Sequence, residues 1–237
     1  MSTQSGYDPR AFPPVAVTVD IVVFTLEHGI FQVALIERGE DPHKGQLALP
    51  GGFIRPDESL IEAAARELNE ETGLKVPDRL EQFSAYGDPD RDPRMRIVSV
   101  AFWAIVPDLP DPVGGTDAAA ARIVPVAEVL STPRTLAFDH HQILQDALEH
   151  ARKALEDTTV ATDFCSDEFS ISDLRHVYET VWGVELDQGN FQKKVLDIEG
   201  FVEPTGKRRS GGQGRPPELY RSGPAERIEP PFRRPAR

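Results

Sequence analysis

The chain has 237 residues, of which 39% are hydrophobic, and it carries a formal net charge of −13 at pH 7 and a single cysteine. A chain of this length can bury a core without covalent staples, and one cysteine excludes both an intramolecular disulfide and a cysteine-rich zinc site. No run approaches 18 apolar residues and the first ten residues lack the apolar stretch of a signal peptide, so we expect a cytoplasmic protein with no membrane span.

Extended segments dominate the first third of the chain. Residues 15–26 and 31–37 are rich in β-branched side chains, and residues 27–30 between them predict a hairpin turn. From 59 to 72 the apolar residues change to a helical spacing. Residues 96–106 predict a further strand. The N-terminal half is therefore expected to mix strands with one central helix.

Three carboxylates lie within one turn of that helix. Glu67, Glu70 and Glu71 are spaced so that they project from one face within reach of one another. Three negative charges in that position repel, and Mg²⁺ would compensate them because it prefers hard oxygen ligands and keeps waters for substrate phosphates. A solvated acidic helix face is the alternative for such a trio.

Neighbouring residues fit a ligand site around the trio. Arg66 precedes Glu70 by four residues and could orient it. Gly51 and Gly52 allow the backbone to approach a ligand closely, so we assign Gly51 to the metal site and Gly52 to ligand binding. Glu58 lies at the helix start, where a carboxylate is favoured by the positive end of the helix dipole, and we also assign it to the ligand.

The whole pattern is more specific than the trio. From Gly52 the chain reads Gly, five residues, Glu, seven residues, Arg-Glu-Leu, one residue, Glu-Glu, one residue, Gly-Leu. This matches the Nudix box at every position, and a chance match in a chain of this length has a probability on the order of 10⁻⁸. The chain therefore resembles the Nudix superfamily.

The resemblance implies an α/β/α sandwich in which a loop, helix and loop hold Mg²⁺ on a nucleoside diphosphate. By this resemblance Glu67, Glu70 and Arg66 are the expected catalytic residues, and Glu67, Glu70 and Glu71 are the expected metal ligands. The metal would polarise the diphosphate and activate the attacking water.

A second segment, GDPDRDPRMRIVSV at 87–100, resembles a loop and strand of the ADP-ribose-binding branch of Nudix proteins. Its arginines, Arg91, Arg94 and Arg96, could reach a diphosphate with two hydrogen bonds each. An ordinary charged loop with proline-fixed turns is the alternative. We expect ligand contact from this loop without assigning it to one arginine.

Charge divides the chain between two parts. Residues 1–187 carry −18 and residues 188–237 carry +5. Such an asymmetry indicates parts with different partners, so the overall charge does not exclude nucleic acid. Between them, 139–157 predicts a helix and 157–163 a linker. Residues 222–237 are rich in proline and arginine with little to bury, and are expected to be disordered.

Two short helices and a hairpin follow the linker. Residues 170–173 fit a capping box, Gly183 ends that helix, and residues 187–190 supply the next cap. The second helix leaves amides and lysines outward, which suits a helix laid in a DNA major groove. Residues 201–203 and 219–221 predict a hairpin whose basic loop would contact phosphates. The expected DNA-binding residues are Asn190, Gln192, Lys193, Lys194, Lys207, Arg208, Arg209 and Arg215. A helical appendage with a solvated basic tail is the alternative.

The segments FSISDLRHVYETVWG, NFQKKVLDIEGF and GRPPELYR, with LAFDHHQIL at 136–144, carry a closer resemblance. Together with the Nudix half they resemble the Nudix-related transcriptional regulators of NAD metabolism, the NrtR family, from residue 11 to about 221. The resemblance implies an α+β chain in which a Nudix sandwich is joined by a helix to a winged helix-turn-helix. The expected parts are a flexible N-terminus (1–10), a Nudix domain (11–137), a linking helix and linker (138–163), a winged helix-turn-helix (164–221) and a disordered basic tail (222–237).

This resemblance implies a homodimeric repressor of NAD biosynthesis or salvage genes. It would bind a palindromic double-stranded operator and be released by ADP-ribose. Many members have eroded Nudix boxes and no hydrolysis, whereas every box position is intact here. A Mg²⁺-dependent ADP-ribose pyrophosphatase, or a protein with both activities, therefore remains an alternative that the sequence does not separate.

Overall fold

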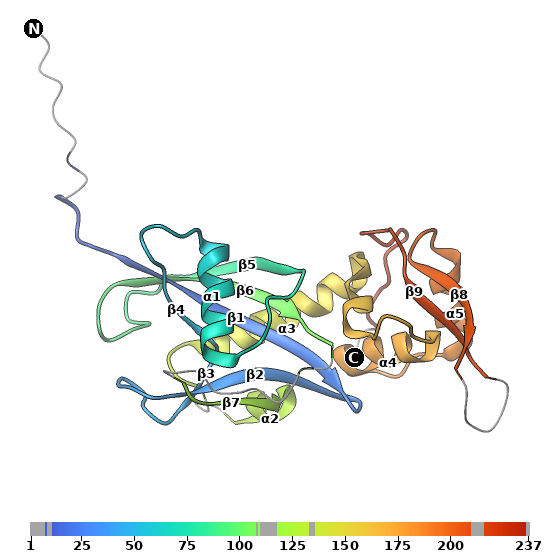
Figure 1. Ribbon diagram of the computed structural model, residues 1–237, viewed down its shortest axis with the longest axis horizontal. Coiled ribbons are helices and arrows are strands. Elements are labelled where there is room, and N and C mark those ends of the chain that lie inside the picture. Colours follow the sequence, from blue (N-terminus) through green and yellow to red (C-terminus); the bar gives the residue numbers. More distant parts are fainter. Residues whose placement is uncertain are drawn as a thin grey trace, which may run out of the picture.

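The computed structural model describes residues 8, 11–107, 109, 118–132, 136–209 and 216–235. Figure 1 shows a larger part built on a twisted sheet and a smaller part of helices and a hairpin, connected by α3. Arg215 and nearly all of the N-terminal segment 1–10 lie outside the described residues. In the described part of the chain, no helix is long and apolar enough to cross a membrane.

A seven-stranded mixed sheet forms the larger part. The strands along its main path are β3 (Leu47–Ala48), β2 (Ile30–Arg38), β1 (Ala16–Glu27), β6 (Ile97–Ile105) and β5 (Leu80–Tyr86). Two further strands, β4 (Gly51–Phe53) and β7 (Ala118–Pro125), pair with β1 and β2 respectively. Only the β1–β6 pair is parallel among these pairings; the others are antiparallel.

Both faces of the sheet are covered by helices. On β1, Val19 and Ile21 pack in one core with α1 (Leu60–Thr72), whereas Val22 and Phe24 pack in a second core with α3 (His140–Asp157). Successive side chains of a strand point to opposite faces, so a strand buried on both faces reads as a nearly continuous apolar run. The α/β/α sandwich expected from the sequence is confirmed.

Local signals set the ends of α1. The Ser59 hydroxyl accepts a hydrogen bond from the backbone of Glu62, whose side chain accepts one from the backbone of Ser59, which completes a capping box. Gly73 ends the helix at a φ of 70°, where glycine has no Cβ penalty. A short helix, α2 (Val126–Ser131), follows β7.

The smaller part continues the second core. After α3 come a 3₁₀ helix, α4, α5 and a two-stranded hairpin, with bounds η2 (Thr159–Phe164), α4 (Ile171–Trp182), α5 (Gln188–Asp197), β8 (Val202–Arg208) and β9 (Glu218–Ser222). The segment predicted as a linker is instead the buried η2, because Val160, Ala161 and Phe164 have apolar surface that packs against the helices.

The predicted disordered tail is wrong for residues 222–235. Ile228 and Phe232 are buried, and their backbone N–H groups donate to the carbonyl oxygens of Asp157 and Glu156 at the end of α3. The Phe232 ring packs on Tyr178 with ring centroids 5.3 Å apart. Composition indicated little to bury, but two apolar side chains with matching backbone hydrogen bonds are enough to fix this segment.

Candidate functional site

A cavity of about 620 Å³ opens beside α1 at the end of the sheet. Its lining residues include Gly51, Gly52, Arg66 and the three helix carboxylates, together with Arg91, Asp92 and Arg94 of the following loop. Phe138 and His140, at the start of α3, complete it. Most of the predicted site residues on and before α1 therefore line one cavity that also touches the linking helix, whereas Glu58, which was assigned to the ligand, is not among its lining residues.

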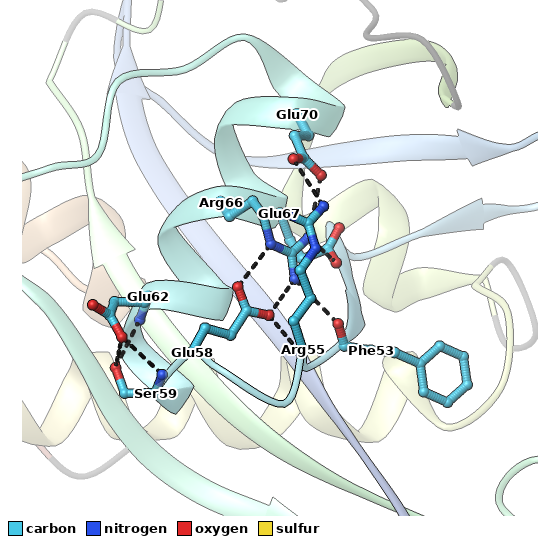
Figure 2. Close-up of polar contacts among 8 residues, drawn as sticks. All are labelled: Phe53, Arg55, Glu58, Ser59, Glu62, Arg66, Glu67 and Glu70. Carbon is cyan, nitrogen blue, oxygen red and sulfur yellow. Dashed lines mark hydrogen bonds and ion pairs between the residues drawn. The ribbon is translucent and has the colours of Figure 1, made fainter.

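Arg66 is the centre of the polar contacts on α1, as Figure 2 shows. Its guanidinium donates to Glu58 from Nε at 2.9 Å, to Glu67 from Nη1 at 2.6 Å and to Glu70 at 3.1 Å. The Arg66 side chain is only 15% exposed. The hydrogen bond from Arg66 lowers the pKa of Glu58 to about 2. Glu58 therefore acts on Arg66 rather than as a free carboxylate at the helix start.

Glu71 lies in a different environment from its neighbours. Its Oε2 accepts a hydrogen bond from the backbone N–H of Gly51 at 2.8 Å. Burial raises the pKa of Glu71 to about 8, and the nearby charges of Glu67 and Asp20 act in the same direction. Glu71 is therefore mostly protonated at neutral pH in the ligand-free chain.

The Glu67 carboxylate lies close to the backbone of Gly52. A Cβ at this position would overlap that carboxylate, so another residue here would require the flexible Glu67 side chain to move. The expected approach of a ligand to the backbone of Gly51 and Gly52 stays a prediction.

The carboxylates do not form a metal site in this arrangement. Among the described residues, no three His, Cys, Asp or Glu side chains are placed to hold one ion. Glu67 and Glu70 form ion pairs with Arg66, and the raised pKa of Glu71 favours its protonated form. The oxygen donors suit Mg²⁺ chemically, but its binding would have to open the contacts of Arg66 and release that proton. The metal assignment stays a prediction.

The three arginines of the 91–96 loop have different positions. Arg91 and Arg94 line the cavity, whereas Arg96 is exposed and is not among its lining residues. Arg91 is 5% exposed and donates to Asp139, while Arg94 donates to Asp92 at 2.7 Å. Arg94 has the more accessible guanidinium of the two that line the cavity.

The aromatic side of the cavity was not predicted from the sequence. The guanidinium carbon of Arg94 lies 5.4 Å from the ring centroid of Phe53 and 5.6 Å from that of Phe138, and Arg38 lies 4.7 Å from the Phe138 ring. Flat rings beside guanidinium groups suit a ligand with both a planar ring and a phosphate. No spacing rule connects Phe53 and Phe138, which are far apart in sequence. Arg55, whose backbone N–H donates to Glu58, was also not assigned to the site from the sequence.

The predicted DNA-binding residues are exposed wherever the structure describes them. On α5 these are Asn190, Gln192, Lys193 and Lys194. The three described basic residues of the β8–β9 hairpin and its loop, which form the wing, are paired with acidic side chains. The pairs are Lys207 with Glu168, Arg208 with Glu218, and Arg209 with Asp173. The basic groups are thus available at the surface, and those of the hairpin have local acidic partners.

Comparison with known proteins adds the family context. A NUDIX domain model matches residues 14–147, and a model of the NrtR DNA-binding winged helix domain matches residues 161–222. A relative from Acinetobacter baylyi, an ADPR responsive transcriptional repressor NtrR, is 31% identical over 91% of this chain and 85% of its own.

Two solved structures from Shewanella oneidensis are also similar. NrtR complexed with a 27mer DNA superimposes with a TM-score of 0.77, is 30% identical, and covers 92% of this chain and 99% of its own. The NUDIX domain of that protein complexed with ADP ribose gives a TM-score of 0.56 and 35% identity, and covers 64% of this chain and 99% of its own.

Proposed function

Because the chain belongs to the NrtR family, with a Nudix domain followed by a winged helix DNA-binding domain, we propose that it is a transcriptional repressor controlled by ADP-ribose. The observation that carries this proposal is similarity to an ADP-ribose-responsive repressor over 91% of the chain, across both domains. We keep the division into a Nudix domain (11–137), a linking segment (138–163) and a winged domain (164–221) as part of the proposal.

The cavity supports ADP-ribose as the effector. It combines the guanidinium groups of Arg94 and Arg38 with the rings of Phe53 and Phe138, and ADP-ribose has both a diphosphate and an adenine ring. Its volume of about 620 Å³ lies within the range of small-molecule sites.

The smaller domain supports binding to an operator. Its exposed α5 carries amides and lysines suited to a major groove, and the β8–β9 hairpin carries the basic wing. We further propose that the chain acts as a homodimer on a palindromic operator near genes of NAD biosynthesis or salvage. A two-fold dimer presents two reading helices to two half-sites. Such a regulator would act in the cytoplasm.

A gel-shift titration on the DNA upstream of the protein's own gene tests the repressor function. The chain should bind this DNA, bind a scrambled duplex of equal length less tightly, and release the first when ADP-ribose is added. Lys193→Gln on α5 should weaken binding, whereas Lys153→Gln, which removes an exposed lysine of α3, should not. Absence of any shift at low salt would defeat the proposal.

A second candidate function is hydrolysis of ADP-ribose, which the intact Nudix box favours. Under this proposal Mg²⁺ would be bound by Glu67, Glu70 and Glu71, and the ion would supply charge stabilisation for the diphosphate. Release of AMP from ADP-ribose with Mg²⁺ should be measured in wild type and in Glu70→Gln. No release from wild type excludes the activity, and equal release from both proteins excludes this assignment of the site.

A further inference from the structure

Asp139 lies at the N-cap of α3 but does not cap it. An aspartate in this position usually accepts a hydrogen bond from a backbone N–H two or three residues further on. The Asp139 side chain makes no such bond to its own helix. Its two carboxylate oxygens instead accept from Arg91, at 2.8 Å from Nε and 2.7 Å from Nη2. The charged pair therefore joins the start of α3 to the loop that lines the cavity.

Arg91 also reaches the sheet below the cavity. Its Nη2 lies 3.4 Å from Oδ2 of Asp20, whose side chain is 8% exposed. Asp20 is on β1 opposite Gly51, the residue whose N–H donates to Glu71 of α1. Arg91 is thus shared between Asp20, which lines the cavity, and Asp139 at the beginning of α3.

The first residue of α3, His140, also contacts Asp20. Nδ1 of the buried His140 accepts a hydrogen bond from the backbone N–H of Leu49 at 2.9 Å. The imidazole hydrogen of the neutral ring is then on Nε2, which lies 3.4 Å from Oδ1 of Asp20. Two successive residues at the start of α3 therefore contact Asp20, directly or through Arg91.

The far end of α3 contacts the winged domain. The Nε of Arg152 donates to the carbonyl oxygen of Val181, and Trp182 donates from its indole N–H to the carbonyl oxygen of Arg152. The helix has 18 residues and is therefore about 27 Å long. A displacement at its first turn would be carried to α4 as a rigid body, and Figure 1 shows α3 running from the sheet to that helix.

We propose that Arg91 and Asp139 are positioning residues that transmit occupancy of the cavity to the winged domain. An anionic diphosphate in the cavity competes with Asp139 for the Arg91 guanidinium, and the start of α3 then moves from its ligand-free position. This inference rests on the proposed function, because it names the route by which ADP-ribose acts on DNA binding.

Asp139→Asn tests the proposal in the full-length chain, since Asp139 does not line the cavity. Operator affinity is measured by fluorescence anisotropy with and without saturating ADP-ribose, and ADP-ribose affinity by calorimetry. We expect the ligand to weaken operator binding on the order of tenfold in wild type. In Asp139→Asn the ligand should leave operator affinity nearly unchanged. ADP-ribose affinity should be kept or raised, because the uncharged amide competes less well for Arg91 than the Asp139 carboxylate does. Asp146→Asn, with the same charge change on an exposed residue of α3, should behave as wild type.

Full coupling in Asp139→Asn would overturn the proposal, and so would loss of ADP-ribose binding by a folded Asp139→Asn protein. If Asp139→Asn does not fold, Asp139→Ser takes its place, because it keeps an N-cap oxygen but removes the two-oxygen contact. If ADP-ribose does not change the operator affinity of the wild-type protein, the proposed function fails instead. Hydrogen exchange then decides the positioning role: exchange in the first turn of α3 and at Leu49 must be faster in Asp139→Asn than in Asp146→Asn, and equal exchange overturns it.

Discussion

Arg66 shows how one guanidinium organises the carboxylates around it. It donates to Glu67 and Glu70, which lie on α1 with it, and to Glu58, which precedes the helix. The sequence predicted the pairing with Glu70 from the four-residue spacing, but not the contact with Glu58 across the preceding loop. The spacing of residues on a helix can be read from the sequence, whereas the path of a loop depends on the side chains that it packs against.

The ionisation of Glu71 makes stability depend on pH. Its pKa is raised from 4.5 to about 8, so the folded chain holds a proton that the unfolded chain loses. Stability therefore falls as pH rises from about 4.5 through 8. Glu71→Gln, which needs no proton, should be more stable than wild type above pH 8, by on the order of a few kcal/mol.

Urea denaturation at several pH values, with metal removed by EDTA, measures this difference. Glu128→Gln, at an exposed position of α2, is the control and should follow the wild-type profile. Parallel profiles for wild type and Glu71→Gln would show that Glu71 titrates normally.

Elements with local signals were predicted within one or two residues. The ends of α1 and α4 follow from capping boxes and from glycines with positive φ, all of which are visible in the sequence. In contrast, β3 and β4 have two and three residues, too few for a period to show. The alanine-rich β7 was missed because it has little β-branched character, and its existence depends on pairing with β2.

The C-terminal segment is an element that composition alone misjudged. Phe232 is buried against Tyr178 and Phe191, so it joins α4 and α5 to the end of α3. Phe232→Ala should lower the free energy of unfolding by about 3 to 5 kcal/mol, as expected for a buried phenylalanine. Arg233→Ala, at the exposed neighbouring position, should change it by less than about 0.5 kcal/mol. Chemical denaturation of both proteins checks this, and equal stabilities would mean that the segment does not pack in solution.

The β8–β9 wing gives a prediction about salt. Lys207 is exposed and pairs with Glu168 at 2.6 Å, a contact that phosphate could replace. If Lys207 contacts a phosphate, Lys207→Gln should reduce the slope of log affinity against log salt by about 0.9. The affinity should fall on both the operator and a scrambled duplex, because phosphate contacts carry no sequence information. A slope equal to that of Lys153→Gln would remove Lys207 from the DNA contacts.

At the scale of the whole molecule, one hydrophobic core runs through both parts, and the boundary between the acidic residues 1–187 and the basic residues 188–237 falls inside the smaller part, between α4 and α5. The net charge of −13 is divided between an acidic region at −18 and a basic region at +5, and the core beneath β2 and α3 extends into α4 and α5. The fold class and both families could be predicted because their motifs are contiguous. The network of Asp20, Arg91, Asp139 and His140 could not, because its members come from three distant segments joined only by folding.

The central claim is that the cavity and the winged domain act on each other. Linkage requires that a ligand which weakens operator binding is itself bound less tightly by the operator complex, by the same factor. The most direct test is the affinity of ADP-ribose for the full-length chain, measured with and without saturating operator DNA. The account predicts weaker binding in the presence of operator, on the order of tenfold. Equal affinities in the two conditions would contradict it.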